Sequence, residues 1–213
     1  MGLITLALAK EELDIPALTT DEDTRIQKFI DAASGYIEGQ CNRVFAQATY
    51  TNERYDGNDT RYLLLRQFPV TSVTSIYLDD DWNFGAGTEI LSAKRQIYRD
   101  CLVVRQCGTF QYTNALAVKV TYVAGFAAIP TDIQQACLDM VVWLYAKRND
   151  RRSGLTAKSK LGENAAYEAE VPPSVLAMIE KHRRENYLAD KLSIFDPAMI
   201  AKIKGESLAK KQN

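Results

Sequence analysis

An acidic run in the middle of the chain, Asp79–Asn83, has the residue types of a calcium-binding loop. Such a loop places glycine at its sixth position and a bidentate glutamate at its twelfth. Counted from Asp79, those positions hold Phe84 and Ile90, and the flanking residues favour strands rather than helices. The run therefore predicts a solvated loop tip, and we expect no metal site.

The only histidine, His182, stands in a basic run with Lys181, Arg183 and Arg184. A histidine can act as a general acid or base because its ordinary pKa lies near neutrality. The flanking cations favour a solvated helix face over a catalytic position. An enzyme built on His182 or on Asp79–Asp81 is therefore the least favoured function.

Cysteines and glycines do not add a reactive set. Cys41 and Cys137 fall on apolar faces of predicted helices and are expected to be reduced core thiols. Cys101 and Cys107 are six residues apart, which is not the C-x-x-C spacing of zinc and redox sites. The chain also lacks the G-x-S-x-G, H-E-x-x-H and Walker motifs, and the two-glycine turn at 85–87 lacks the third glycine of a dinucleotide site. We expect no catalytic residue and no cofactor.

A basic run, Lys147–Arg152, allows three interpretations. A helix C-terminus favours cations through its dipole. The run could also meet an acidic partner, or the phosphates of a nucleic acid. No aromatic residues interleave with it, which weakens the case for single-strand binding.

Bulk composition limits the possible classes of protein. The chain has 213 residues, 46% of them hydrophobic and 25% charged, and a net charge of −1. That is enough apolar material for a core, without the basic excess of a dedicated nucleic-acid binder. The apolar run Leu3–Leu8 is far shorter than the roughly 20 residues of a membrane span, and it has no signal-peptide pattern. Leu6 breaks the myristoylation motif, so no membrane association is expected.

The segment from Leu116 to Gly154 is the most informative about the fold. Alternating residues predict a half-buried strand up to Val123, which Gly125 ends. Thr131 and Gln134 have capping-box spacing after Pro130. The predicted helix, 131–148, is apolar nearly all round, which is typical of a helix buried between several neighbours; its apolar residues are Ile133, Ala136, Cys137, Leu138, Met140, Val141, Val142, Trp143, Leu144 and Tyr145.

Helices are predicted at 5–13 and 20–42, and a β-rich insert at 44–123. Within the insert, the turn Asp56–Asp59 predicts a hairpin between Tyr50–Tyr55 and Arg61–Leu65. A strand is expected at Val70–Leu78, and two short strands at 97–98 and 102–105. The fold class is therefore α+β: a helical bundle with an inserted β-sheet and hairpin region, followed by an extended C-terminal segment.

After Gly154 the pattern loosens. Residues 156–170 predict a mobile or partner-ordered loop, and Pro172-Pro173 begins a further helix. Asp196-Pro197 begins a short terminal helix. Its apolar face could dock on a partner or pack on its own domain, and the residues concerned are Phe195, Met199, Ile200 and Ile203. The predicted divisions are 1–154, 155–192 (loop plus helix) and 193–213 (partner-docking tail).

The order of several passages resembles the head–tail connector proteins of tailed phages, which are also called adaptor or head-completion proteins. The resemblance covers about 3–154, and no single motif is diagnostic. The passages are Leu3–Lys10 with Leu13, Asp21–Ile26 with Ile30–Ala33 and Tyr36–Glu38, Cys41–Phe45, Phe68–Val73, and Tyr122–Phe126 with Ile129-Pro130 and the helix to Arg148.

This resemblance implies a structural protein of the virion neck, assembled in the host cytoplasm. It implies an adaptor ring, dodecameric like the portal above it, that extends the DNA channel without sequence-specific DNA binding and offers a docking surface to the stopper or tail. The alternative is a tail-completion or other neck protein. Candidate partner-contact residues are Lys147, Arg148, Arg151, Arg152, Phe195, Met199, Ile200 and Ile203.

Overall fold

The computed structural model describes residues 2–111, 114–149, 157–160, 163–166 and 171–204. It divides the chain into two compact units. The helical unit comprises Met1–Ala46 and Ala128–Asn186, and the sheet unit comprises Gln47–Ala127 and Tyr187–Asn213. The α+β fold class predicted from the sequence is confirmed.

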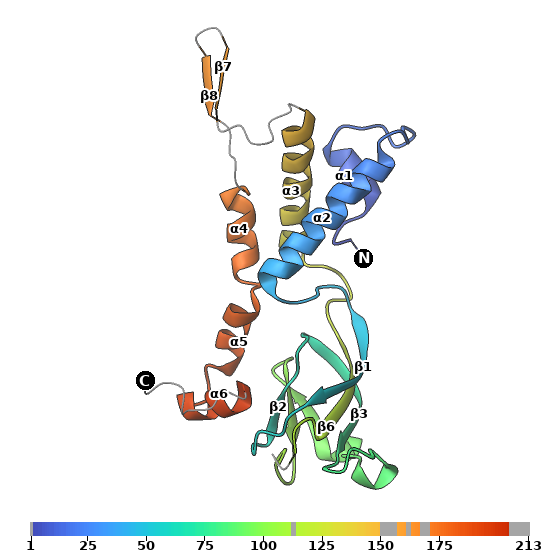
Figure 1. Cartoon of the computed structure of the whole chain (residues 1–213), viewed down its shortest axis with the longest axis vertical. Helices are drawn as coiled ribbons and strands as arrows, with labels where there is room; N and C mark the ends of the chain where they lie inside the picture. The colour runs from blue at the N-terminus through green and yellow to red at the C-terminus, as the bar shows by residue number, and fades with distance from the viewer. Residues whose placement is uncertain (1, 112–113, 150–156, 161–162, 167–170, 205–213) are drawn as a thin grey trace. The chain divides into compact units, whose positions relative to one another are not determined.

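The helical unit is built from α1 (Leu6–Glu12), α2 (Asp23–Cys41), α3 (Thr131–Asn149) and α4 (Pro173–Glu180). Helix α3 packs against the other three, and α1 also packs on α2 (Figure 1). The predicted helices are thus present, with ends within three residues of the expected ones. The apolar spacing of α2 and α3 explains the packing, because it places these residues in the core: Ile26, Ile30, Ala33, Ile37, Ile133, Ala136, Cys137 and Val141.

Helix α3 is only partly enclosed. The apolar residues of its first half are buried, but every side chain from Val142 to Arg148 is at least partly exposed. The prediction of burial all round is therefore wrong for the second half, where Trp143 is covered by a charged side chain: Nζ of Lys147 lies 4.5 Å from the centre of the Trp143 ring.

The start of α3 also differs from the expected capping box. Thr131 is the first helical residue rather than the cap. The carbonyl of Pro130 accepts from the backbone N–H groups of Ile133 and Gln134, and the Gln134 side-chain amide donates to the carbonyl of Ile129 at 2.8 Å. The carbonyl of Pro130 thus accepts the first-turn N–H groups that the Thr131 hydroxyl was expected to accept.

The first sheet of the sheet unit is antiparallel, in the order β1 (Ala48–Tyr55), β6 (Val118–Ala124) and β3 (Val70–Leu78). The predicted alternation is present in β6, whose residues Val118, Val120, Tyr122 and Ala124 are buried. Because β6 is the central strand, these residues form the middle of the sheet's apolar face.

The second sheet has the order β2 (Tyr62–Leu64), β5 (Leu102–Arg105) and β4 (Arg95–Tyr98). The short strands expected near 97–98 and 102–105 pair as predicted. The hairpin predicted around Asp56–Asp59 is wrong, because β1 and β2 belong to different sheets. The backbone N–H groups of Asn58 and Asp59 donate instead to the carbonyl of Phe110, both at 2.8 Å, and this long-range contact redirects the chain.

A second apolar cluster of the sheet unit includes the C-terminal helices α5 (Arg184–Leu192) and α6 (Pro197–Lys204). Leu188, Leu192 and Ile203 are buried there with Phe68 and Leu102. The terminal helix predicted after Asp196 is thus present, and residues 187–213 group with the sheet unit.

Two further strands, β7 (Ala157–Lys160) and β8 (Glu163–Ala166), pair with each other as an antiparallel hairpin in the segment that was predicted to be a loop. The two four-residue strands have no periodic apolar pattern, so periodicity does not predict them. The predicted division at 154 falls outside the described residues. The divisions at 154 and 192 both stay predictions.

Candidate assembly surfaces

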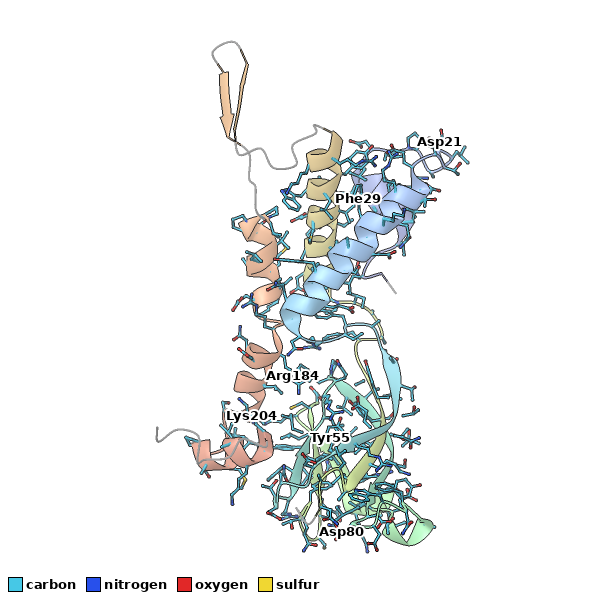
Figure 2. The ribbon with its side chains drawn as sticks, in the orientation of Figure 1. Asp21, Phe29, Tyr55, Asp80, Arg184 and Lys204 are labelled. Atoms are coloured by element: carbon cyan, nitrogen blue, oxygen red, sulfur yellow. The ribbon has the colours of Figure 1, made fainter. Side chains whose placement is uncertain are left out.

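The carboxylate of Asp79 in the acidic loop accepts hydrogen bonds from the loop's own backbone. The Asp79 carboxylate accepts from the backbone N–H of Asp81 at 3.0 Å and from that of Phe84 at 2.7 Å. Trp82, half-exposed, donates its indole N–H to the carbonyl of Ala115 at 3.0 Å. Within the described part of the chain, no group of three or more His, Cys, Asp or Glu residues could hold a metal ion. Asp80, labelled in Figure 2, lies in the same loop.

His182 is not a solvated side chain, and that prediction is wrong. Its side chain is 14% exposed, and Nε2 lies 2.8 Å from Oδ2 of Asp132. Its ring meets that of Phe45 edge-on, with centroids 5.9 Å apart. Nζ of Lys181 lies 2.5 Å from the same Asp132 oxygen. The residues after α4 are thereby fastened to the first turn of α3.

The pKa of Asp132 reflects this arrangement. Burial acts to raise the pKa, but the hydrogen bonds and positive charges of Lys181 and His182 outweigh burial and lower it to about 2. Asp132 therefore stays ionised and serves as a structural anchor, not as a proton donor.

A buried lysine that sequence reasoning missed organises the other end of the helical unit. The Lys10 side chain is 5% exposed, and Nζ lies 2.8 Å from Oδ1 of Asp23. Nζ also donates to the carbonyls of Ala17 at 3.0 Å and Thr19 at 2.6 Å. These bonds hold the loop between α1 and α2 against α1. A single lysine on a short helix gives no sequence signal of such a role, because it depends on where the following loop returns.

A polar cluster in the sheet unit is likewise structural. The hydroxyls of Tyr55 and Tyr122 both donate to Oε2 of Glu53, at 2.5 and 2.8 Å. The same two hydroxyls accept from the backbone N–H groups of Arg66 and Gln67. Burial is the main cause that raises the pKa of both phenols, so they remain neutral hydrogen-bonding groups. Figure 2 labels Tyr55 among the side chains of this unit.

The predicted basic contact lies at the end of α3. Lys147 is half-buried against Trp143, and Arg148 is exposed. Both lie in the last turn, as the dipole interpretation requires. Arg151 and Arg152 fall outside the described residues, so contact of this run with a partner stays a prediction.

The predicted apolar contact on α6 is partly occupied by the chain itself. Ile203 is buried, and Phe195, Met199 and Ile200 pack around the same cluster. The ring centroid of Phe195 lies 4.8 Å from that of Tyr62. The Asp196 carboxylate accepts from the backbone N–H of Met199 at 2.8 Å, which is the N-cap contact expected from the sequence. Of the two interpretations, the single chain shows packing on its own domain, and partner contact by these residues stays a prediction.

Residues 3–185 match the model of the head completion protein family. The chain belongs to this family. The resemblance stated from the sequence is therefore confirmed. No curated protein matches the chain.

Three solved structures share the fold. A chain of the neck of a native GTA particle, computed with C12 symmetry, has a TM-score of 0.56 and 19% identity, covering 84% of this chain and 87% of that one. A chain of the neck of an empty GTA particle, computed with C6 symmetry, has a TM-score of 0.53 and 22% identity, covering 85% and 89%. A chain of the virion of a native gene transfer agent has a TM-score of 0.51 and 20% identity, with the same two coverages as the C6 neck chain.

Among the described residues, no helix is long and apolar enough to cross a membrane.

Proposed function

We propose that this protein is a structural component of the virion neck in a tailed-phage particle, a head–tail adaptor. Identical subunits form a ring beneath the portal, extend the DNA channel and present a docking surface to the stopper or tail. The observation that carries this proposal is the head completion family match over residues 3–185. The fold shared with neck chains of GTA particles supports the same location.

The chemistry of the described side chains supports an assembly role over an enzymatic one. The ionisable groups that stand closest together hold the fold: Asp132 with His182, Lys10 with Asp23, and Glu53 with its two tyrosines. Each of these groups has its partners within the fold. A protein that works by assembly needs complementary surfaces rather than a reactive group.

The ring is proposed to be dodecameric. Head-to-tail contacts use two different surfaces of each subunit, and they close into a ring when the rotation between neighbours fits. The neck structures that share this fold were computed with C6 and C12 symmetry, both compatible with twelve copies. DNA passes through such a channel without being read, which agrees with a net charge of −1 on the subunit.

Portal contact is assigned to the C-terminal segment and to the basic end of α3. Phe195, just before α6, and Met199 and Ile200 on α6 are partly exposed, whereas Ile203 is buried. Lys147 and Arg148 would meet acidic groups of a neighbouring subunit or of the portal.

Removal of the protein from the particle tests the proposal. Particles made without it should contain portal and package DNA, yet fail to retain the DNA or to attach tails. Normal tailed particles would contradict the proposal. The alternative, a tail-completion protein, predicts that crosslinking finds tail subunits and never the portal.

A further inference from the structure

The helical unit contains a cavity of about 540 Å³ where the chain passes from α1 to α2. Lys10 lines this α1–α2 cavity, but its ammonium is already bonded to the carbonyls of the following loop and to the Asp23 carboxylate. The cavity is therefore mostly apolar, and its volume is in the range of cavities that take up side chains or small molecules. Its lining residues are Leu6, Ala7, Lys10, Glu11, Ile15, Ala17 and Asp23.

The chain around this cavity is acidic. Residues 10–25 contain six carboxylates and two cations, and each cation is paired: Lys10 with Asp23, and Arg25 with Glu22. Unpaired carboxylates around an apolar cavity favour a partner that carries positive charge. Four carboxylates are exposed and make no side-chain hydrogen bond or ion pair within the described residues: Glu11, Glu12, Asp14 and Asp21, the last labelled in Figure 2.

The sheet unit presents an apolar side chain beside a lysine. Leu91 is 57% exposed, and Lys94 is exposed as well. The backbone N–H of Lys94 donates to the carbonyl of Leu91 at 2.9 Å. This is the bond of a tight turn, which holds the two Cα atoms within about 7 Å of each other. In the described residues the Lys94 ammonium has no carboxylate partner. The nearest acid in the sequence, Glu89, lies 4.0 Å from Arg95, so its charge is balanced.

The other exposed apolar side chains lack this combination. Among the side chains that the structure describes, none of them has an exposed lysine or arginine within three residues. Trp82 stands next to Asp81, which an acidic surface would repel. Charge complementarity therefore selects Leu91 over the remaining exposed residues, which are Leu18, Val44, Trp82, Leu116, Leu176 and Ile194.

We propose that Leu91 of one copy enters the α1–α2 cavity of the next copy, where Lys94 pairs with the unpaired carboxylates. The inference rests on the proposed ring. The two surfaces are different and belong to different units of the chain, so each copy uses both, and the contact repeats head-to-tail until the ring closes. The aliphatic stem of Lys94 adds apolar contact while its ammonium stays among the carboxylates.

A ladder of disulfide-linked chains tests the contact. The full-length chain carries Cys107→Ser, because Cys107 is the exposed cysteine and the other three are buried. It also carries Leu91→Cys and Ala7→Cys, since Ala7 is an exposed residue of the cavity lining. Particles are assembled with this chain, purified and oxidised, and their proteins are separated without reductant. We expect linked dimers, trimers and longer chains, because a disulfide joins Cα atoms that approach within about 7 Å.

The matched control replaces Leu91→Cys by Leu116→Cys, at an exposed leucine of the same unit. The yield of linked chains should be at least about tenfold lower in the control. Adding Lys94→Glu to the Leu91→Cys chain should lower its yield about threefold, and Glu11→Lys should then restore it. Thermal melting of each variant confirms that it is folded, and Ala93→Cys, at an exposed neighbour, replaces Leu91→Cys if that variant is not.

Other outcomes overturn the contact. Dimers without longer chains would indicate a symmetric contact, and a disulfide within one chain would place both surfaces in a single copy. The absence of any link, or a yield equal to that of the control, would show that the two surfaces do not meet. A yield that Lys94→Glu leaves unchanged would reject the pairing of the lysine. Each of these results, in particles that contain this protein in the neck, leaves the adaptor proposal standing. Particles whose neck lacks this protein would reject the adaptor itself.

Discussion

Oδ2 of Asp132 lies 2.8 Å from Nε2 of His182, and this contact joins the first turn of α3 to the residues that follow α4. The two residues are 50 positions apart in the chain. The contact turns a basic run that looks solvated in the sequence into part of the helical unit's packing.

Asp132→Asn should destabilise the protein. The variant keeps the shape of the side chain but loses its charge-assisted bonds to His182 and Lys181. Because Lys181 is 69% exposed, solvent screens part of the interaction, and we expect a loss of about 1–2 kcal/mol in the free energy of unfolding. Urea denaturation measures it. Asp139→Asn, on the same helix with a single contact to Gln135, is the control and should be near neutral. Equal losses in both variants would contradict the anchoring role.

The pH dependence of the same interaction has a defined sign. Folding lowers the pKa of Asp132 from 3.8 to about 2, so the folded state binds this proton less readily than the unfolded state. Its contribution is therefore complete above the unfolded pKa and is lost as the pH falls from about 4 to about 2. The difference in stability between the wild type and Asp132→Asn should shrink over that interval. A difference that stays constant down to pH 2 would contradict this assignment.

Ile203→Ala should destabilise the sheet unit. Ile203 is 4% exposed among Phe68, Leu102 and Leu192, and its truncation leaves a cavity that costs about 2–4 kcal/mol. Ile194→Ala, at a residue that is 52% exposed, is the matched control and should change stability little. If the denaturant midpoints of the two variants coincide, α6 does not pack as described.

The buried position of Ile203 determines which C-terminal deletion can test portal binding. Deletion of 193–213 removes Ile203 from the core and should lower the melting temperature of the sheet unit. Deletion of 205–213 keeps Ile203 and should weaken portal binding. Unchanged portal affinity would show that these residues make no contact with the portal.

Trp143→Ala should lower the free energy of unfolding by less than the same substitution of a fully buried tryptophan would. Truncation of a fully buried tryptophan costs about 3–5 kcal/mol. Because Trp143 is only partly buried, the expected loss is about 1–2 kcal/mol. Ile133→Ala, on the same helix and fully buried, should cost about 2–4 kcal/mol in the same denaturation experiment. A larger loss at Trp143 than at Ile133 would contradict the partial burial of the second half of α3.

The elements set by local periodicity could be predicted, and those set by distant contacts could not. The stripes of α2 and α3 and the alternation of β6 repeat every few residues, so a short window reveals them. Strand partners carry no such signal. The turn at Asp56–Asp59 has the residue types of a hairpin. Its backbone N–H groups bond the carbonyl of Phe110 instead, and the next strand belongs to another sheet.

The polar contacts show the same limit. Lys10 and His182 have ordinary neighbours in the sequence, and their roles arise from partners that the fold brings close: Asp23 for Lys10 and Asp132 for His182. Glu53 lies two residues from Tyr55, but their shared partner Tyr122 is 69 positions away from Glu53. The apolar residues of α6 pack within the chain, and contact of this helix with a partner stays a prediction. In the single chain these residues pack on the β2–β5–β4 sheet.

Imaging of the intact particle neck tests the central claim most directly. The full-length chain is tagged, the particles are purified, and the neck is reconstructed with and without a label bound to the tag. The adaptor proposal predicts a ring of this protein between the portal and the tail, with sixfold or twelvefold symmetry as in the related necks. Label confined to the capsid shell or to the far end of the tail, with a complete neck that lacks this protein, would contradict it.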